Sequence, residues 1–278
     1  MKIVLFYLLP KNIISYLIGG LSKIKIPVAI RETLYGLYVK NYSVNLDESK
    51  LKLVDFDSFS KMFVRELKPN IRPISDTSEI VSPVDGTCAN IGVVKSDTVF
   101  QAKGINYSLS SLFNDSIIGQ HFADGAKYWT FYLAPGDYHR IHSPVEGRVV
   151  SRLYVPGHLF PVNEYTRNFL PNLFIENERV ITLIETIKNE FIAVVKVAAL
   201  NVGGIELDFE KDFRNRSLSN VNDRFKLFRE PIPIKKGEEL GSFYLGSTVI
   251  VVSNIKGLKS LDILNSKVKY GEKIVEND

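Results

Sequence analysis

The sequence contains a single cysteine, Cys88, which excludes an internal disulfide framework and leaves no pair of thiolates for a metal ion. No apolar run among its 278 residues approaches the ~20 residues of a membrane-spanning helix, because Pro10 and Lys11 separate two shorter runs, 3–9 and 13–21. No small-residue cleavage site follows the first run, which argues against a secretory signal peptide. The sequence also lacks a glycine-rich loop that would cradle nucleotide phosphates.

The composition is that of an ordinary globular protein, with 45% hydrophobic and 24% charged residues. The length predicts one elaborated domain or two small ones. The net charge of +4 is concentrated near the start, where residues 1–40 contain one acidic residue, Glu32, and six basic ones: Lys2, Lys11, Lys23, Lys25, Arg31 and Lys40. Apolar runs between these lysines predict a helix lying in a membrane interface against anionic headgroups. A helical hairpin packed on its own domain would show a similar pattern.

Apolar residues recur at helical spacing over residues 11–41 and again over residues 57–67. Asp57 or Ser58 is suited to cap the start of the second helix. The stretch 68–73 contains two prolines, Pro69 and Pro73, which disfavour a helix. It therefore predicts an extended connection between the helical region and a different kind of structure.

From about residue 80 onward the sequence changes to short β-prone runs punctuated by glycine and proline. These runs predict strands at residues 128–133, 148–155, 180–184, 191–197 and 248–252. Long helical stretches between them are missing, which disfavours parallel βαβ units and favours an antiparallel sandwich or barrel. We therefore predict an α+β protein, with an N-terminal helical, membrane-associating region (1–75) and a mainly antiparallel β-rich catalytic domain (76–278).

One internal repeat is present, in which Ser82-Pro-Val-Asp-Gly86 recurs as Ser143-Pro-Val-Glu-Gly147. Proline presets φ and glycine permits a positive φ, so each copy predicts a tight turn that leads into a strand. The repeat resembles the turns of duplicated barrel-sandwich domains of the biotinyl-carrier type. From the residues alone, Asp85 is either a side chain that stabilises its turn or a catalytic carboxylate.

Two of the four histidines, His139 and His142, lie in the segment Asp137-Tyr-His-Arg-Ile-His142. A metal site is disfavoured, because neighbouring prolines and glycine argue against a helix and no third ligand is evident. Two roles remain open at this point. The histidines are either structural or they move protons near neutral pH, for which imidazole is the best-suited side chain.

Gly246-Ser247 comes directly before the predicted strand 248–252. With Asp85 and one histidine, Ser247 has the components of a nucleophilic triad, but it lacks the strand-to-helix elbow of a serine hydrolase. Glycine allows the backbone to bend sharply, so the serine hydroxyl can instead approach the preceding carbonyl and attack its own peptide bond. A simple turn is the third interpretation.

Ordered motifs over nearly the whole chain are similar to those of the bacterial and mitochondrial phosphatidylserine decarboxylases, which are self-processing pyruvoyl enzymes. The matching segments are Phe63-Val-Arg-Glu-Leu67, Arg72-Pro-Ile74, Ser82-Pro-Val-Asp-Gly86, Gln101-Ala-Lys-Gly104, Tyr132-Leu-Ala-Pro-Gly-Asp-Tyr-His-Arg-Ile-His142, Tyr154-Val-Pro-Gly157, Pro171-Asn-Leu-Phe174, Asn177-Glu-Arg-Val180, Asn201-Val-Gly203, Lys236-Gly-Glu-Glu-Leu-Gly241 and Leu245-Gly-Ser-Thr248. Ile105 stands where many members carry histidine, and His158 stands where an acidic residue is frequent.

The resemblance implies that the chain is cleaved between Gly246 and Ser247 into a β chain, 1–246, and an α chain, 247–278. Asp85 and His142 would act with Ser247 in this self-cleavage, and His139 would serve near the reacting group during decarboxylation. Ser247 would become a covalent pyruvoyl group, which is the only cofactor implied.

In turnover the resemblance implies a Schiff base between the pyruvoyl carbonyl and phosphatidylserine, with release of carbon dioxide and phosphatidylethanolamine. It implies a heterodimer of the β and α chains, with a dimer of these left open, and no nucleic-acid partner. It places the protein peripherally on an anionic membrane, at the cytoplasmic face of the cell membrane. A second membrane contact is expected at Leu159 and Phe160, unless that loop is buried against the core.

Three other functions share parts of this pattern. A pyruvoyl decarboxylase of free amino acids would use the same Gly-Ser chemistry without needing a basic, apolar N-terminal segment. A serine hydrolase would keep Ser247 as a hydroxyl. A carrier or binding domain of barrel-sandwich type would show neither self-cleavage nor a reactive serine.

Overall fold

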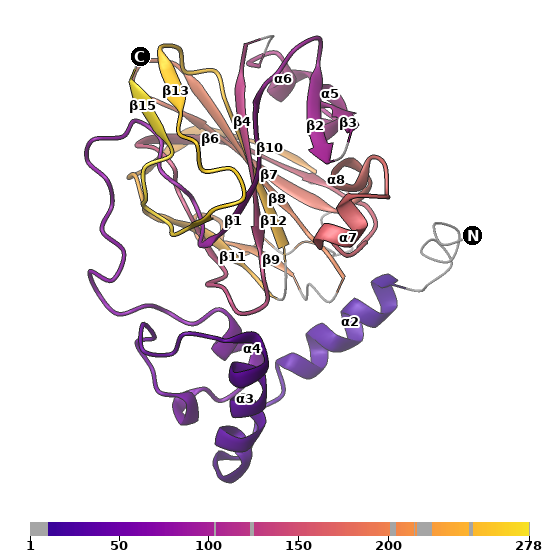
Figure 1. Cartoon of the computed structure of the whole chain (residues 1–278), viewed down its shortest axis with the longest axis vertical. Helices are drawn as coiled ribbons and strands as arrows, with labels where there is room; N and C mark the ends of the chain where they lie inside the picture. The colour runs from indigo at the N-terminus through magenta and orange to yellow at the C-terminus, as the bar shows by residue number, and fades with distance from the viewer. Residues whose placement is uncertain are drawn as a thin grey trace.

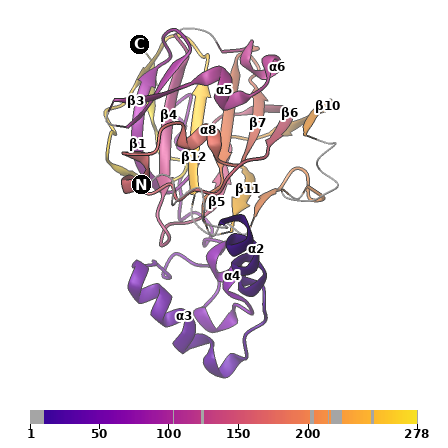
Figure 2. The same ribbon diagram turned by 90° about the vertical axis from the view of Figure 1, so that its right-hand side faces the viewer.

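The computed structural model describes residues 11–102, 104–122, 125–200, 204–213, 215, 224–244 and 247–277. Figures 1 and 2 show a helical region at the N-terminal end that lies beneath one end of a large twisted sheet. Its elements are α2 (Lys11–Ser22), α3 (Val28–Tyr42), the 3₁₀ turn η1 (Leu53–Asp55) and α4 (Phe59–Phe63). The α+β class is confirmed.

The predicted helix over residues 11–41 is two helices, because Pro27 starts α3 and residues 23–27 form the bend between them. The second predicted helix, residues 57–67, is much shorter than expected. Ser58 caps α4 as predicted, and its side chain accepts a hydrogen bond from the amide of Lys61. The helix ends at Phe63 because residues 66 and 68 pair their backbones with residues 50 and 48.

Eight strands form one sheet in which every neighbouring pair is antiparallel, in the order β10-β6-β7-β8-β12-β4-β1-β14. All five predicted strands lie in it. Their bounds and those of their neighbours are β1 (Gly86–Val93), β4 (Lys127–Leu133), β6 (Gly147–Val155), β7 (Arg179–Glu185), β8 (Phe191–Val197), β10 (Phe225–Ile234), β12 (Ser247–Ser253) and β14 (Lys267–Val268).

Smaller elements surround this sheet. Three small antiparallel sheets are formed by β5 (Arg140–His142), β11 (Glu239–Phe243) and β9 (Ile205–Leu207), by β13 (Leu258–Ser260) and β15 (Val275–Asn277), and by β2 (Thr98–Ala102) and β3 (Ile105–Ser108). Four short helices are α5 (Leu109–Phe113), α6 (Ser116–Gly119), α7 (Glu164–Arg167) and α8 (Leu173–Glu176). The sheets of the described residues are open, so the predicted duplicated barrel-sandwich is not confirmed.

The two copies of the Ser-Pro-Val repeat form the predicted turns. Ser82 Oγ donates to the Val84 carbonyl at 2.8 Å, and Ser143 Oγ donates to the Val145 carbonyl at 2.7 Å. Each copy ends in a glycine that is the first residue of a strand, Gly86 of β1 and Gly147 of β6. A Cβ at Gly86 would come within 2.6 Å of a carbonyl oxygen on the adjacent strand, and a Cβ at Gly147 within 2.3 Å. Glycine is therefore required by close backbone approach in both copies.

The core of the β domain is continuous and includes the loop that was expected to touch a membrane. Leu159 and Phe160 are both fully buried, so the expectation that they insert among acyl chains is wrong. Cys88 is likewise fully buried, and burial raises the pKa of its thiol to about 12. Among the described residues, no helix is both long and apolar enough to cross a bilayer.

Candidate active site

The predicted site residues gather at the end of the sheet that faces the helical region (Figures 1 and 2). The segment 134–139 follows β4 and crosses this end. Its carbonyls accept hydrogen bonds from the helical region, with Tyr38 Oη donating to Pro135 O at 2.7 Å and Arg65 Nη2 to Gly136 O at 3.1 Å. A Cβ at Gly136 would lie 2.1 Å from the Tyr42 carbonyl oxygen, so glycine permits this contact. The helices therefore cover the site.

Ser247 is the first residue of β12 and pairs with Leu133, the last residue of β4. Its side chain is fully buried, and its Oγ has no hydrogen-bond partner among the described residues. A buried hydroxyl without a partner is uncommon and calls for a chemical explanation. The other half of the predicted cleavage site, Gly246, lies outside the described residues.

His139 is completely buried between the sheet end and α4, where its ring centroid lies 4.1 Å from that of Phe63. Its Nδ1 lies 2.9 Å from the Asp137 carbonyl, which only accepts hydrogen bonds, so Nδ1 carries the proton. Nε2 therefore has a lone pair, and it has no partner. Burial lowers the pKa of His139 to about 3, which keeps the ring neutral.

His142 is also buried, and both of its ring nitrogens have partners. Nδ1 lies 2.8 Å from the Gly237 carbonyl, so it donates, and Nε2 lies 3.1 Å from the hydroxyl of Tyr138. The ring of Tyr270 stacks on the imidazole with 3.8 Å between centroids and 5° between planes. Burial lowers the pKa of His142 to about 4, so its neutral form is available as a base.

Asp85 makes its strongest contacts with a buried arginine. Arg72 Nη2 donates to Asp85 Oδ2 at 2.6 Å, and Nε lies 3.2 Å from Oδ1. The same guanidinium also pairs with Glu48. Burial alone would lower the pKa of Arg72, but these two carboxylates raise it above its usual value. The amide of Tyr270 supplies a further hydrogen bond to Asp85 Oδ1 at 2.9 Å.

The structure brings the four predicted residues to one end of the sheet but does not join them in a hydrogen-bonded relay. Among the described residues, no hydrogen bond connects Asp85 to His142, or Ser247 to either histidine. Sequence reasoning named no role for Tyr138 or Tyr270. Tyr138 stands inside the Asp-Tyr-His motif, whereas Tyr270 lies in a Lys-x-Gly-Glu segment, 269–272, that repeats residues 235–238.

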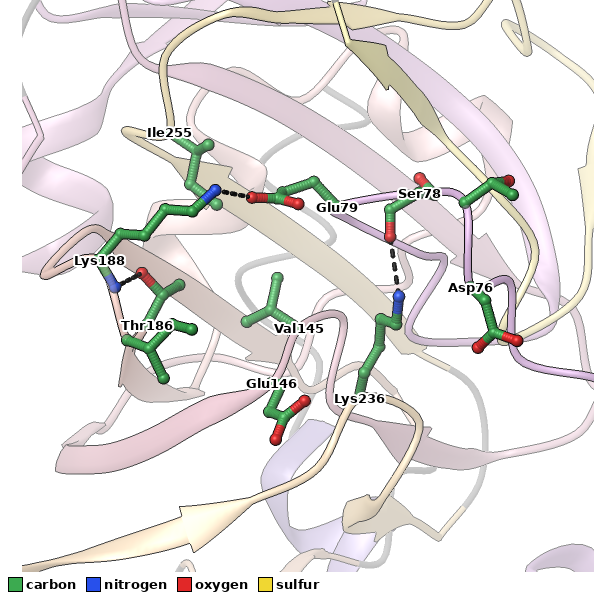
Figure 3. A pocket seen from close by; sticks show the side chains of 11 residues that line it. Asp76, Ser78, Glu79, Val145, Glu146, Thr186, Lys188, Lys236 and Ile255 are labelled. Atoms are coloured by element: carbon green, nitrogen blue, oxygen red, sulfur yellow. Dashed lines mark hydrogen bonds and ion pairs between the residues drawn. The ribbon is translucent and has the colours of Figure 1, made fainter.

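The second copy of the Ser-Pro-Val repeat, residues 143–147, borders a pocket of about 330 Å³ that none of the four predicted site residues lines (Figure 3). Glu146, which stands in the place of Asp85, is exposed. Lys236 donates to the Ser78 carbonyl at 2.8 Å, and Lys188 pairs with Glu79 at 2.6 Å, so both cations are already engaged. No histidine lines this pocket. The surroundings of Asp85, in the first copy, are therefore better suited to acid–base chemistry than this pocket.

The described residues contain no group of three or more histidine, cysteine, aspartate or glutamate side chains arranged to hold a metal ion. Among their buried polar atoms without partners, Ser247 Oγ and His139 Nε2 belong to predicted site residues, and His142 supplies a second neutral imidazole. Such an arrangement is able to deprotonate a hydroxyl and to transfer protons away from bulk water.

The sequence profile described as phosphatidylserine decarboxylase matches residues 59–276 of this chain. Three similar curated proteins are each named phosphatidylserine decarboxylase proenzyme. The protein of Alcanivorax borkumensis is 39% identical over 90% of this chain and 86% of its own length. That of Pseudoalteromonas translucida is 40% identical over 90% of this chain and 88% of its own length. That of Myxococcus xanthus is 34% identical over 97% of this chain and 96% of its own length.

Proposed function

This chain belongs to the phosphatidylserine decarboxylase family, and on that premise we propose that it converts phosphatidylserine into phosphatidylethanolamine and carbon dioxide after cleaving itself. The observation that carries the proposal is the fully buried Ser247, whose Oγ has no partner, at the start of the strand that begins the implied α chain. Most buried structural hydroxyls are hydrogen-bonded, although Ser151 and Thr248 of this chain also lack partners among the described residues. A serine consumed in a reaction need not be hydrogen-bonded.

Maturation starts with proton transfer from Ser247 to a neutral imidazole, for which we propose His142 Nε2 once the Tyr138 hydroxyl that donates to this atom has turned away. The alkoxide attacks the Gly246 carbonyl carbon, the peptide C–N bond breaks, and an ester and a free amine result. Loss of the Cα proton of residue 247 then expels the Gly246 carboxylate and leaves dehydroalanine. Its tautomer takes up one water and releases one ammonia, so residue 247 ends as a ketone at the start of a new chain. The products are the β chain, 1–246, and the α chain, 247–278.

The site fits the pyruvoyl group that this maturation would leave at position 247. The position is sealed from water, it needs no metal, and two neutral imidazoles lie in the same sheet end. When present, this carbonyl supplies an electron sink for the pair of electrons left behind when carbon dioxide departs. The protein's own residues have to bind the substrate, exclude water and deliver one proton to the α-carbon.

We propose that His139 delivers that proton. Its Nδ1–H is fixed on the Asp137 carbonyl, so Nε2 is the atom able to receive and return a proton. In the free protein burial holds its pKa near about 3. An anionic substrate carboxylate or phosphate beside the ring stabilises the imidazolium and raises that pKa toward neutrality. Protonation of His139 is thereby coupled to substrate binding.

We further propose that residues 1–75 attach the protein peripherally to an anionic membrane and that residues 76–278 form the catalytic domain. The described helices support this because α2 and α3 leave large apolar side chains exposed: Ile13, Leu17, Leu21, Val28, Ile30, Leu34 and Leu37. Lys23 and Lys25 are exposed at the bend between them. Apolar side chains bordered by lysines fit a bilayer surface rich in anionic headgroups, such as the cytoplasmic leaflet.

A pocket of about 300 Å³ lies between this bend and the segment that leads to Ser247. It is lined by Lys23, Lys25, Lys61 and Tyr244, among others. The ammonium of Lys23 lies 5.3 Å from the centre of the Tyr244 ring. This pocket lies next to the apolar helices, and we propose that it binds a lipid headgroup whose acyl chains remain in the membrane.

Intact-mass analysis under denaturing conditions tests the proposed function. The expected result is two chains divided between residues 246 and 247, with the smaller one lighter by one ammonia than its sequence predicts and reactive toward hydroxylamine. Ser247→Ala is expected to stay full-length and to release no carbon dioxide from phosphatidylserine. An uncleaved wild-type chain that reacts with a fluorophosphonate would instead identify a serine hydrolase.

A further inference from the structure

Asp85 and His142 are connected through a third residue, Tyr270. The amide of Tyr270 donates to Asp85 Oδ1 at 2.9 Å, and its ring lies flat on the His142 imidazole, 3.8 Å between centroids and 5° between planes. Tyr138 adds a second ring, 5.5 Å from that of Tyr270, and its hydroxyl contacts His142 Nε2. One residue of the implied α chain thus touches both groups that the self-cleavage is proposed to use.

The turn that carries Tyr270 is held in place on several sides. Gly271 adopts a φ of 85°, and its amide donates to the Ser82 carbonyl at 2.9 Å. Glu272 Oε2 accepts from the amide of Lys269 at 3.0 Å. The ammonium of Lys269 pairs with Glu48, the same carboxylate that binds Arg72. Asp85, Arg72 and this turn therefore form one connected unit, in which Asp85, Arg72 and Gly271 are buried and Lys269 and Glu272 are exposed.

We propose that Tyr270 is a positioning residue for proton transfer by His142, and that Asp85 acts on His142 through Tyr270 rather than through a direct hydrogen bond. The inference rests on the proposed function, because it assumes that His142 is the base in self-cleavage. Asp85 fixes the backbone of the turn, and the ring of Tyr270 fixes the plane of the imidazole. The lone pair on Nε2 is thereby held in one direction, and water is kept from one face of the ring.

The second copy of the repeat supports a specific role for the aromatic ring. Lys236 is the counterpart of Tyr270 in the matching Lys-x-Gly-Glu turn, and Val81 precedes Ser82 as His142 precedes Ser143. The backbones match, since Val81 N donates to Pro144 O at 3.0 Å and His142 N donates to Pro83 O at 2.8 Å. Tyr270 belongs to the turn that binds the first copy through Ser82, and it stacks on the histidine that precedes the second copy, whereas the equivalent pair of positions holds Lys236 and Val81. The turn itself does not require an aromatic residue.

The test compares self-cleavage in Tyr270→Leu, Tyr270→Phe and wild type, followed by gel and intact mass after cell-free synthesis. Both variants keep the backbone donor to Asp85, so they report on the ring. We expect Tyr270→Leu to cleave about tenfold to a hundredfold more slowly, because a small misplacement of a reacting group has that effect. Tyr270→Phe is expected to cleave at close to the wild-type rate. Tyr165→Leu, which removes the same atoms from an exposed site on α7, is the matched control.

The pH profile separates positioning from general loss of structure. The titratable and charged groups that face His142 are Tyr138, Tyr270 and Arg140. Removing the ring admits water and relieves part of the burial that depresses the pKa of His142. The acid limb of the cleavage profile should therefore move up in Tyr270→Leu by roughly one pH unit, and it should stay in place in Tyr270→Phe.

Cleavage of Tyr270→Leu at the wild-type rate, or equal slowing in Tyr270→Phe, would overturn the proposal. Tyr270→Met replaces the leucine variant if that variant does not fold, because its flexible side chain fills an irregular gap more readily. His142→Asn is measured alongside. Normal cleavage of His142→Asn would contradict the proposed role of His142 as the base, and failure of the wild-type chain to cleave would contradict the proposed function itself. Blocked cleavage of His142→Asn, combined with normal cleavage in Tyr270→Leu, would contradict only the inference about Tyr270.

Discussion

Among the deeply buried ionisable side chains without an ion pair in the described part of the chain are His139, His142 and Lys196. Burial lowers the pKa of each, to about 3, about 4 and about 7. Burial removes the water that stabilises the charged form of a group, so it favours the neutral form, which keeps its hydrogen-bonding atoms. The two histidines are therefore neutral proton acceptors at physiological pH. The burial of Lys196 lowers the stability of the folded chain.

His139→Asn is expected to separate maturation from turnover. Asn retains a polar side chain but cannot transfer a proton, so we expect self-cleavage to proceed while decarboxylation falls by about 10²-fold or more. Intact mass reports the cleavage, and carbon dioxide release from phosphatidylserine vesicles reports the turnover. An uncleaved variant would show that His139 is required earlier than we propose.

The buried histidines should make stability depend on pH in acid. Their pKa values in the folded chain lie below the ordinary value of 6.5, so between about 4 and 6.5 the unfolded chain binds more protons than the folded one. The free energy of unfolding should therefore fall as pH drops through this window, by on the order of 3 kcal/mol for His142 alone. Urea unfolding of uncleaved Ser247→Ala measures it. The same series with His142→Asn added should lose part of this dependence, and an unchanged slope would contradict it.

Lys196 donates to Thr182 Oγ1 at 2.6 Å in the interior of the sheet. Lys196→Met with Thr182→Val removes both polar groups from this place and is expected to stabilise the chain by about 1–3 kcal/mol, since buried charges are often less stable than apolar replacements. Thermal unfolding measures the change. Thr182→Val alone is the control. It should destabilise, because it leaves the lysine without its partner.

At the scale of elements, helices α2 and α3 differ from the rest of the molecule in what they leave uncovered. Leu17 and Leu21 of α2 are 58% and 64% exposed, and Leu37 of α3 is 66% exposed. Helices that pack only within a protein bury such residues. The same region also contacts the site, because Tyr38 and Arg65 donate hydrogen bonds to the carbonyls of segment 134–139. These helices therefore link an exposed apolar surface to the segment that carries His139.

Leu17→Glu is expected to weaken binding to anionic vesicles by about tenfold or more, because it removes an exposed apolar side chain that we propose inserts into the bilayer and adds charge repulsion. Self-cleavage should be unaffected, since Leu17 lies outside the site. Leu264→Glu makes the same change at a residue of similar exposure on the β domain and should bind like wild type. Co-sedimentation with vesicles measures both. Equal binding by all three proteins would refute a membrane role for α2.

At the scale of the whole molecule, the proposed cleavage falls just before a central strand. β12 lies between β8 and β4, pairs with β4 along its full length and with β8 from Thr248 to Ser253, and all seven of its residues are buried. Tyr270, on the same side of the cleavage point, also completes the surroundings of His142. Cleavage should therefore leave the fold intact.

The β and α chains are accordingly expected to stay together after cleavage. Native mass spectrometry should show the summed mass of residues 1–246 and 247–278, and only denaturing conditions should separate them. Thr248→Pro removes a backbone donor from β12 and is expected to weaken this association. Recovery of a free α chain by gel filtration under native conditions would contradict the expectation.

Much of the fold follows from local pattern. The five strands were predicted because alternating and continuous apolar runs such as residues 191–197 suit a buried antiparallel sheet. The two Ser-Pro-Val turns follow from proline and glycine chemistry that acts within five residues. Helix lengths were less predictable. Pro27 divides residues 11–41, and distant backbone pairing at residues 48–50 ends α4 early, which no local pattern reveals.

By itself, the sequence determined the candidate chemistry, because Asp85, His139, His142 and Ser247 are side chains whose reactivity is intrinsic and whose motifs are local. Only the tertiary structure decided their surroundings. It buried both imidazoles, left Ser247 Oγ without a partner, paired Asp85 with Arg72 and brought Tyr270 from the far end of the chain onto His142. These contacts depend on which strands become neighbours, and that is set by packing over the whole chain.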